Sequence, residues 1–232
     1  MRLVNNEAET DTETVRISMD TKATVNLGGY SRGGKSRGQR AIEALDHDMR
    51  PKDKLVPGGI LEVSSGRPFL FFSESNKTSD FVADGLWAWW GQYGQEFPQI
   101  KRLVLNMDNG PECSGRRSQF LRRMVEFADE TGLTVRLAYY PPYHSKYNPI
   151  EHYWGGLEQS WNGYLLDSTE CVMNRAANFV WRGVRTTVTF LGGVYAKGVR
   201  LCARERKSLE RRLQRSERLR WWDVTIAPLV VC

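Results

Sequence analysis

Leu103-Val-Leu-Asn-Met-Asp108 is a short apolar run that ends in an acid. Its length and composition are typical of a buried strand, with Asp108 at the strand's end. An amphipathic stretch follows at 114–131, with apolar residues along one helical stripe and arginines on the other side, and Gly132 closes it. This region therefore predicts a strand followed by a helix, the repeating unit of an α/β fold.

The chain upstream predicts three strands and a helix. Residues 15–27 alternate in part between apolar and polar side chains, and 59–72 predicts two antiparallel strands joined at a Ser-Ser-Gly turn. Apolar residues at helical spacing predict a helix from Ser79 to Tyr93, with Ser79 or Asp80 as its N-cap.

The chain downstream of Gly132 predicts a further strand and a further helix. Residues 133–139 form the strand, a Pro-Pro pair ends it, and the helix begins near Asn148-Pro149 because proline suits the first helical turn. The resulting order is three strands, helix, strand, helix, strand and helix. That order predicts an RNase H-like α/β fold, with a mixed five-stranded sheet flanked by helices.

The chain of 232 residues is long enough for one well-cored domain. Hydrophobic residues make up 41% and aromatic residues 11%, so a full core is available. We expect 1–14 to be a disordered polar lead-in, 15–165 to form the RNase H-like domain, and 166–232 to form a mostly helical extension with a basic helix.

Composition also bears on the cellular compartment. No apolar run approaches the roughly 20 residues that a membrane-spanning helix needs, and the N-terminus is polar and acidic, unlike a signal peptide. The four cysteines, Cys113, Cys171, Cys202 and Cys232, match neither a zinc motif nor a disulfide framework, so we expect free thiols. These features predict a cytoplasmic protein without membrane contact.

Positive charge is concentrated near the C-terminus. The net charge is +6, and residues 200–220 hold nine Arg or Lys against three Glu. Such a segment is either a solvated helix face or a contact to the phosphate backbone of nucleic acid. For a nucleic-acid contact, Arg211, Arg212 and Arg215 are the candidates.

Two further acids stand in positions like that of Asp108. Asp20 interrupts a β-branched stretch, where an acid is costly unless it has a function, and Glu151 falls in the first turn of the helix that begins near Pro149. Taken singly, each acid has an ordinary explanation as a turn residue or a partner of the helix dipole. Together, three carboxylates at the ends of separate elements can hold two divalent cations, an arrangement that cuts and joins phosphodiesters.

Two other motifs are further candidates for a functional site. Asp48, in Asp46-His-Asp48, is a reserve metal ligand, although acid-rich loops more often serve as turns. Gly29-Tyr-Ser-Arg-Gly-Gly-Lys-Ser36 matches the phosphate loop of a P-loop NTPase, which needs a buried parallel strand before it and a helix after it. The preceding 21–27 alternates as an antiparallel strand does, which favours the carboxylate site over the ATPase alternative.

The motifs taken together resemble a known family. Similarity to bacterial insertion-sequence transposases of the DDE type is carried by Ile17-Ser-Met-Asp20, Ser31-Arg-Gly-Gly-Lys-Ser36, Asp46-His-Asp48, Asp108-Asn-Gly-Pro-Glu112 and Pro141-Pro-Tyr-His-Ser-Lys-Tyr-Asn-Pro-Ile-Glu151. The chain is similar in particular to the group with the Rhodopirellula-type transposase DDE domain, from about Val15 to Pro228. In this family the phosphate-loop match is a loop with no nucleotide implied.

The resemblance implies an activity and its ligands. It implies Mg²⁺-dependent hydrolysis at the ends of a mobile DNA element, followed by attack of the freed 3′-hydroxyl on target DNA. Asp20, Asp108 and Glu151 would be the metal-binding acids, with two Mg²⁺ ions that Mn²⁺ can replace. The partners would be double-stranded DNA, at element ends and target, and a second copy of the chain as a homodimer, with the DNA-bound protein at the nucleoid.

Basic residues near the acids are candidates for DNA contacts. Lys146 precedes the helix that carries Glu151, His152 follows that acid directly, and Arg116 and Arg117 lie shortly after Asp108. For each of them the alternative is an ordinary side chain that faces solvent.

A transposase usually recognises its element's ends through a helix-turn-helix region ahead of the catalytic domain. Only 19 residues precede Asp20, and they are too acidic for such a module, so we expect the recognition domain to be lacking. Two hypotheses therefore stand beside the ATPase alternative. One is a competent metal nuclease and strand transferase, and the other is a noncatalytic DNA-binding remnant of a decayed element.

Overall fold

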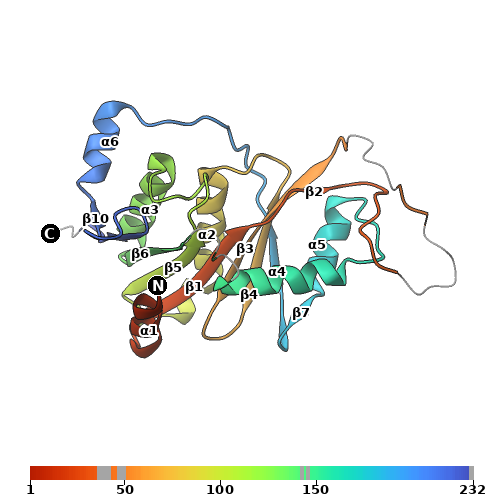
Figure 1. Ribbon diagram of the computed structural model, residues 1–232, viewed down its shortest axis with the longest axis horizontal. Coiled ribbons are helices and arrows are strands. Elements are labelled where there is room, and N and C mark those ends of the chain that lie inside the picture. The colour runs from red at the N-terminus through yellow and green to blue at the C-terminus, as the bar shows by residue number, and fades with distance from the viewer. Residues whose placement is uncertain (36–42, 46–50, 142–143, 145–146, 230–232) are drawn as a thin grey trace.

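A mixed sheet lies at the centre of the molecule, with helices on both faces (Figure 1). The computed structural model describes residues 1–35, 43–45, 51–141, 144 and 147–229. Within these ranges the sheet has nine strands, in the order β10-β11-β6-β5-β1-β3-β4-β9, with β2 beside β3. The candidates Asp48 and Lys146 lie outside the described residues.

The five central strands form the mixed sheet that the sequence predicts. They are β1 (Thr14–Thr21), β3 (Lys54–Glu62), β4 (Pro68–Ser73), β5 (Arg102–Asp108) and β6 (Thr134–Tyr140). β1, β3 and β4 form an antiparallel meander, and β5 and β6 continue from β1 as parallel strands. β3, β4 and β5 are buried along most of their length, as strands covered on both faces are.

Two helices cover one face of the sheet. They are α2 (Ser79–Tyr93) and α3 (Ser118–Thr131). A short 3₁₀ helix, η1 (Gly94–Glu96), follows α2 directly. Their apolar side chains share one core with Ile17 and Met19 of β1. Because side chains alternate along a strand, Ser18 and Asp20 point to the opposite face.

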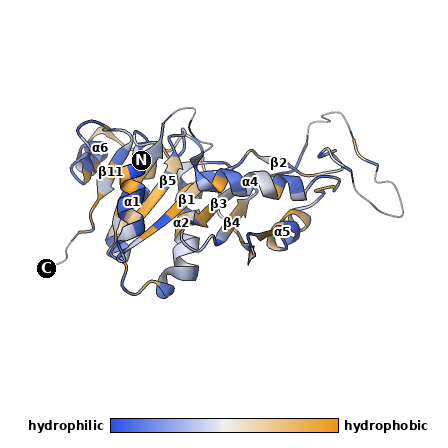
Figure 2. Ribbon diagram, turned by 60° about the horizontal axis from the view of Figure 1, so that its bottom comes forward, coloured by the Kyte–Doolittle hydropathy of each residue, from blue (hydrophilic) through white to orange (hydrophobic). Residues whose placement is uncertain are grey.

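The opposite face is covered by α4 (Pro149–Ser160) and α5 (Thr169–Ala177). Trp154 of α4 and Val172 of α5 join a second core with Leu61 and Leu70 of the meander. In Figure 2 the central strands are coloured mostly as hydrophobic, whereas hydrophilic residues lie on the outer helices. Asp20 therefore emerges from an apolar sheet into the layer that contains α4.

Local signals fix the ends of α2 and α3. The Thr78 side chain accepts a hydrogen bond from the backbone N–H of Phe81 at 3.3 Å, so Thr78 is the N-cap of α2 in place of the two residues predicted. α3 ends at Gly132, whose φ of 73° lies in the left-handed region that glycine adopts without strain.

The segment expected to be a disordered lead-in is instead a helix, α1 (Arg2–Thr10). Its buried residues Val4 and Ala8 are four apart on one helical face, and they pack against Val104 and Ala138 of the sheet. The segment is too polar and too short to be a stable helix alone, so its contact with the sheet is what stabilises it.

The C-terminal part is less helical than expected. Besides α5, the described residues there contain one helix and five short strands: α6 (Ala203–Glu210), β7 (Val180–Trp181), β8 (Val184–Arg185), β9 (Thr187–Phe190), β10 (Leu213–Arg215) and β11 (Asp223–Ile226). β9 pairs with β4 at one edge of the sheet, and β11 pairs with β6 and β10 at the other. The basic segment 200–220 is thus a short helix and an edge strand, because Leu213 packs into the core beside Ile226.

The glycine-rich segment lacks the surroundings of a phosphate loop. β2 (Val25–Asn26), which precedes it, is a two-residue strand antiparallel to β3, and Gly28 bridges Leu166. A phosphate loop needs a buried parallel strand at this point. The structure therefore does not favour the ATPase alternative.

Two expectations from composition are tested by the described residues. None of the described helices combines the length and the apolar character that crossing a bilayer requires. Cys113, Cys171 and Cys202 carry free thiols, as expected, and Cys232 lies outside the described ranges.

Candidate active site

Asp20 and Asp108 come from neighbouring parallel strands. In the register of β1 and β5, Ser18 lies opposite Asn106, and two further residues along each strand bring Asp20 level with Asp108. Both acids stand at the carboxyl ends of their strands, where α/β folds commonly bind ligands. The pairing therefore brings both carboxyl groups to one edge and one face of the sheet.

Ser18 places Glu151 on the same face. The Ser18 hydroxyl donates a hydrogen bond to Asn148 Oδ1 at 2.5 Å and accepts one from the backbone N–H of Ile150 at 2.9 Å. Ser18 and Asn148 are fully buried, so these bonds fix the first turn of α4 onto β1. Glu151 lies in that turn, one residue beyond the bonded amide.

Gly59 lets α4 approach the sheet closely. It lies opposite Asp20 in the pairing of β1 and β3, and a Cβ atom at this position would stand 2.8 Å from Cζ2 of Trp154. Only glycine leaves room for that indole ring. The close packing of α4 over β3 keeps the helix start beside the acid on β1.

The three carboxylates influence one another electrostatically. Burial raises the pKa of Asp20 to about 7, with further increases from the charges of Glu151 and Asp108. The pKa of Asp108 is also raised, first by burial and then by the charge of Glu151. A bond from the backbone of Thr21 and the charge of Lys77 oppose the shift at Asp20 without cancelling it. The three acids therefore belong to one negatively charged site.

A divalent cation fits the chemistry of this site. Oδ1 of Asp108 is buried and has no hydrogen-bond partner among the described residues. Such an oxygen is costly when it is left alone, and Mg²⁺ prefers hard oxygen ligands of this kind. No group of three or more His, Cys, Asp or Glu in the described ranges is already arranged as a set of ligands. Charges interact over longer distances than a metal–oxygen bond, so the acids share one site without forming a closed cage.

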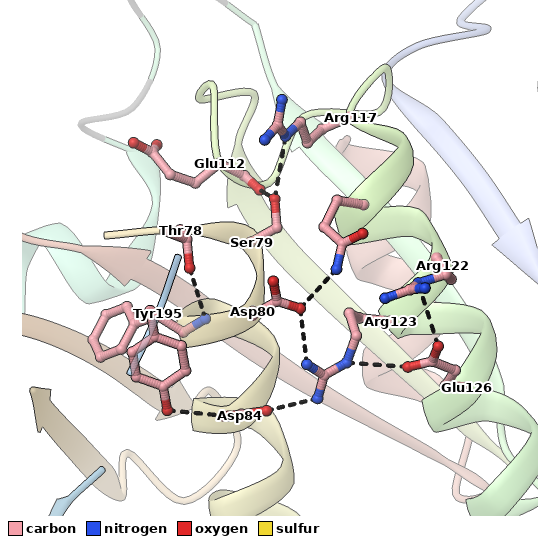
Figure 3. Close-up of polar contacts among 12 residues, drawn as sticks. Thr78, Ser79, Asp80, Asp84, Glu112, Arg117, Arg122, Arg123, Glu126 and Tyr195 are labelled. Carbon is pink, nitrogen blue, oxygen red and sulfur yellow. Dashed lines mark hydrogen bonds and ion pairs between the residues drawn. The ribbon is translucent and has the colours of Figure 1, made fainter. Parts of the chain in front are cut away.

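The loop after Asp108 is held from several sides. The Cys113 thiol donates to the carbonyl oxygen of Asp108 at 3.3 Å, and the Tyr139 hydroxyl donates to the carbonyl oxygen of Cys113 at 2.6 Å. The Ser79 hydroxyl donates to the carbonyl oxygen of Glu112 at 2.6 Å, as Figure 3 shows. Burial, followed by the charge of Asp20, raises the pKa of the Cys113 thiol to about 12, so this thiol stays neutral.

The predicted DNA contacts near the acids lie in different surroundings. His152 is exposed on α4 beside Glu151, and Arg116 is exposed with its guanidinium 5.0 Å from the ring centre of Trp221. Arg117 is partly buried and donates to Ser79 Oγ and to the carbonyl oxygen of Val199, each at 3.4 Å.

Two of the three arginines predicted on the basic helix make strong contacts within the protein. Arg212 pairs with Asp129 through two hydrogen bonds of 2.9 and 2.6 Å. The Arg215 side chain is only 8% exposed and bonds to Glu210 at 2.6 and 3.0 Å. Arg211 is exposed just beyond the end of α6. A contact to the phosphate backbone of nucleic acid needs an exposed arginine. Of these three arginines, Arg211 is the one with an exposed side chain.

Sequence reasoning missed two residues of this site. Ser18 was part of a motif, but its bonds to α4 join residues that are more than a hundred positions apart in the chain. Lys77 lies in the loop between β4 and α2, close enough for its charge to lower the pKa of Asp20. Nothing in its local sequence marks it.

The fold and the three acids define an RNase H-like domain with a carboxylate site. Mos1 transposase in a paired-end complex with the left transposon end is similar in structure, with a TM-score of 0.50 at 9% identity over 75% of this chain and 50% of that chain. The Mos1 mariner paired end complex with Mn gives a TM-score of 0.49 at 11% identity, over 75% of this chain and 49% of that chain. The HTLV-2 integrase catalytic core domain in complex with magnesium gives a TM-score of 0.38 at 13% identity, over 75% of this chain and 92% of that chain.

The family model of the Rhodopirellula transposase DDE domain matches residues 2–228. The chain therefore belongs to this family of DDE transposase domains, which confirms the resemblance read from the motifs and, with the structural likeness, the RNase H-like fold. The chain spans about half the length of the Mos1 transposase that it resembles. No curated protein matches the sequence.

Proposed function

We propose that this chain is the catalytic domain of a DNA transposase that cleaves the ends of its element and joins them to target DNA. The observation that supports the proposal is the grouping of Asp20, Asp108 and Glu151, in which burial and mutual repulsion raise the pKa of both aspartates. Like charges are gathered in this way where a cation is to be bound. Membership of the DDE transposase family gives the substrate, DNA.

The three acids would hold two Mg²⁺ ions, which Mn²⁺ can replace. When bound, the two ions supply activation of the attacking water or 3′-hydroxyl and stabilisation of the leaving oxygen. Asp20 and Asp108 would bind from the rigid strand ends, and Glu151 from the first turn of α4. Ser18 would keep the helix-borne acid in register with the two strand-borne acids. The partly open arrangement leaves room for phosphate oxygens to complete the coordination.

The partners would be double-stranded DNA, at element ends and target, and a second copy of the chain. Arg116, Arg211 and His152 are exposed and suited to contact the DNA backbone, and Lys146, outside the described residues, stays a candidate. We place this chemistry in the cytoplasm, at the nucleoid.

A nicking assay tests the activity. Supercoiled DNA is incubated with Mg²⁺ or Mn²⁺ and with wild type, Asp108→Asn or Glu151→Gln, and both variants are expected to lose at least a hundredfold in rate. Glu158→Gln is the matched control, because Glu158 lies two turns along α4 from Glu151 and forms an ion pair with Lys22 at 3.3 Å. Nicking that survives Asp108→Asn would discard the site.

The same proteins separate catalysis from mere DNA binding. Mn²⁺ binding, followed by electron paramagnetic resonance, is expected in wild type and Glu158→Gln and to be weakened in Asp108→Asn. A noncatalytic remnant would bind DNA but neither bind Mn²⁺ at this site nor nick. The raised pKa values of two neighbouring acids favour the catalytic proposal over that alternative.

A further inference from the structure

A cavity of about 290 Å³ opens between the start of α2, the loop after Asp108 and the segment 196–199. Its size is at the small end of ligand pockets, which begin at about 300 Å³. The residues that matter for its chemistry are Lys77, Ser79, Glu112, Arg117, Gln119 and Lys197. We call it the α2 pocket.

The α2 pocket has cations that form no salt bridge with a carboxylate in the described part of the chain. Among the described residues, Lys77 and Lys197 form no hydrogen bond or ion pair, and Arg117 donates only to neutral oxygens at 3.4 Å. Arg123, further along α3, shows the opposite situation. Figure 3 shows its guanidinium held between Asp80 and Asp84, at 2.9 and 2.6 Å.

The acids of the α2 pocket do not cancel this charge. Asp80 is already neutralised by its ion pair with Arg123, and it also accepts a hydrogen bond of 2.8 Å from the Gln119 side chain. Glu112 binds Ser79 through its carbonyl oxygen, and its carboxylate points away from Arg117 in Figure 3. The cations at the pocket therefore remain free to meet an anion.

One further feature favours an anion at this place. The first turn of α2 borders the cavity, and the positive end of its dipole favours an anion there. The α2 pocket also lies near the carboxylate site, because the charge of Lys77, which lines the pocket, acts on Asp20.

We propose that the α2 pocket binds a backbone phosphate of the DNA strand that passes through the carboxylate site, adjacent to the phosphate that is cut. The inference rests on the proposed function for its substrate. Lys77 and Lys197 would meet the phosphate as point charges, and Arg117 would turn its planar guanidinium toward two phosphate oxygens. A phosphate fixed here would set which phosphodiester reaches the three acids.

DNA binding without metal tests the proposal independently of catalysis. Binding of a random double-stranded oligonucleotide is measured by fluorescence anisotropy in EDTA at several salt concentrations. Lys77→Gln/Lys197→Gln is expected to weaken binding roughly tenfold at about 0.1 M salt and to lower the salt slope by about one. Arg185→Gln is the control, because this exposed arginine lies on the short strand β8, outside the pocket.

The outcomes separate this proposal from the proposed function. If wild type does not bind the oligonucleotide, the proposed function itself fails. If wild type binds and the double variant keeps the same slope and melting temperature, only the pocket is overturned. Inorganic phosphate and ATP are tested in parallel. Binding of either one as tight as that of DNA, and lost in the double variant, would overturn the DNA backbone as the source of the phosphate.

Discussion

At the scale of single residues, Asp20 opposes the stability of the metal-free protein. It is a partly buried acid beside two others, and its pKa of about 7 lies far above the ordinary value of 3.8. Between these two values the folded chain binds a proton that the unfolded chain has already released. Below about pH 4, Asp20 is protonated in both states and does not lower the free energy of unfolding. As the pH rises from about 4 to about 7, Asp20 lowers this free energy progressively.

This sign gives a pH-dependent prediction for Asp20→Asn. In EDTA, the free energy of unfolding of wild type should fall between pH 4 and pH 7 by an amount on the order of 3 kcal/mol, because one pKa unit corresponds to about 1.4 kcal/mol. The variant should lose most of this dependence and be the more stable protein at pH 8. Urea unfolding at pH 5 and pH 8 measures both effects.

Asp129→Asn is a control of opposite sign. The pKa of Asp129 is lowered, chiefly by its hydrogen bonds with Arg212, so the ionised carboxylate stabilises the fold. That stability is present above the ordinary pKa of Asp and is lost only as the pH falls through the lowered value. The control should therefore be less stable than wild type at both pH values. An Asp20→Asn protein that is also less stable at pH 8 would contradict the account of Asp20.

At the scale of elements, the attachment of α4 to β1 depends on one serine. Ser18→Ala leaves the Asn148 side chain and the backbone N–H of Ile150 without their buried partner. The expected loss is about 1–3 kcal/mol for each group left unsatisfied. Nicking should fall by more than the loss of folded protein explains, because Glu151 moves relative to Asp20. Ser160→Ala, at the other end of α4, is the control and should keep full activity.

Arg215 links the C-terminal strands to the loop after Asp108. Its guanidinium donates to the carbonyl oxygen of Gly115 at 2.8 Å, and its charge lies 4.5 Å from the ring centre of Trp221. Arg215→Lys should lower the nicking rate about tenfold or more, because an ammonium replaces neither the paired bonds to Glu210 nor the stacking. Arg215→Gln removes the charge as well, and its salt slope for DNA binding should stay that of wild type, whereas loss of a direct phosphate contact would lower the slope by about one.

Sequence patterns predicted elements where the local signal and the tertiary contacts agree. α2 has apolar residues at helical spacing throughout, and it begins and ends where the pattern does. α1 and β10 were not foreseen, because their apolar residues are few. Val4 and Ala8 on α1, and Leu213 on β10, become core only through contact with the sheet. The three acids could be proposed from the sequence because each ends or opens an element, whereas Lys77 gains its position only from folding.

At the scale of the whole molecule, the carboxylate site joins both helical layers to the centre of the sheet. β1 and β5 bring acids from the middle of the sheet, α4 brings one from one layer, and α2 supports the loop after Asp108 from the other. A cation that bridged these parts would bind the folded chain and not the unfolded one. On the proposed function, metal binding would therefore stabilise the whole fold.

Thermal unfolding measures this coupling. At 100 times its dissociation constant an ion adds about 2.7 kcal/mol, which corresponds to roughly 5–11 °C in melting temperature for a domain of this size. Mg²⁺ should produce such a shift in wild type at pH 8 and little at pH 5, where protonated Asp20 is a poor ligand. Asp20→Asn and Asp108→Asn should lose the shift, whereas Glu158→Gln should keep it. An equal shift in Asp108→Asn and wild type would mean that the ion binds elsewhere on the molecule, and the three acids would then be a repulsive cluster without a metal function.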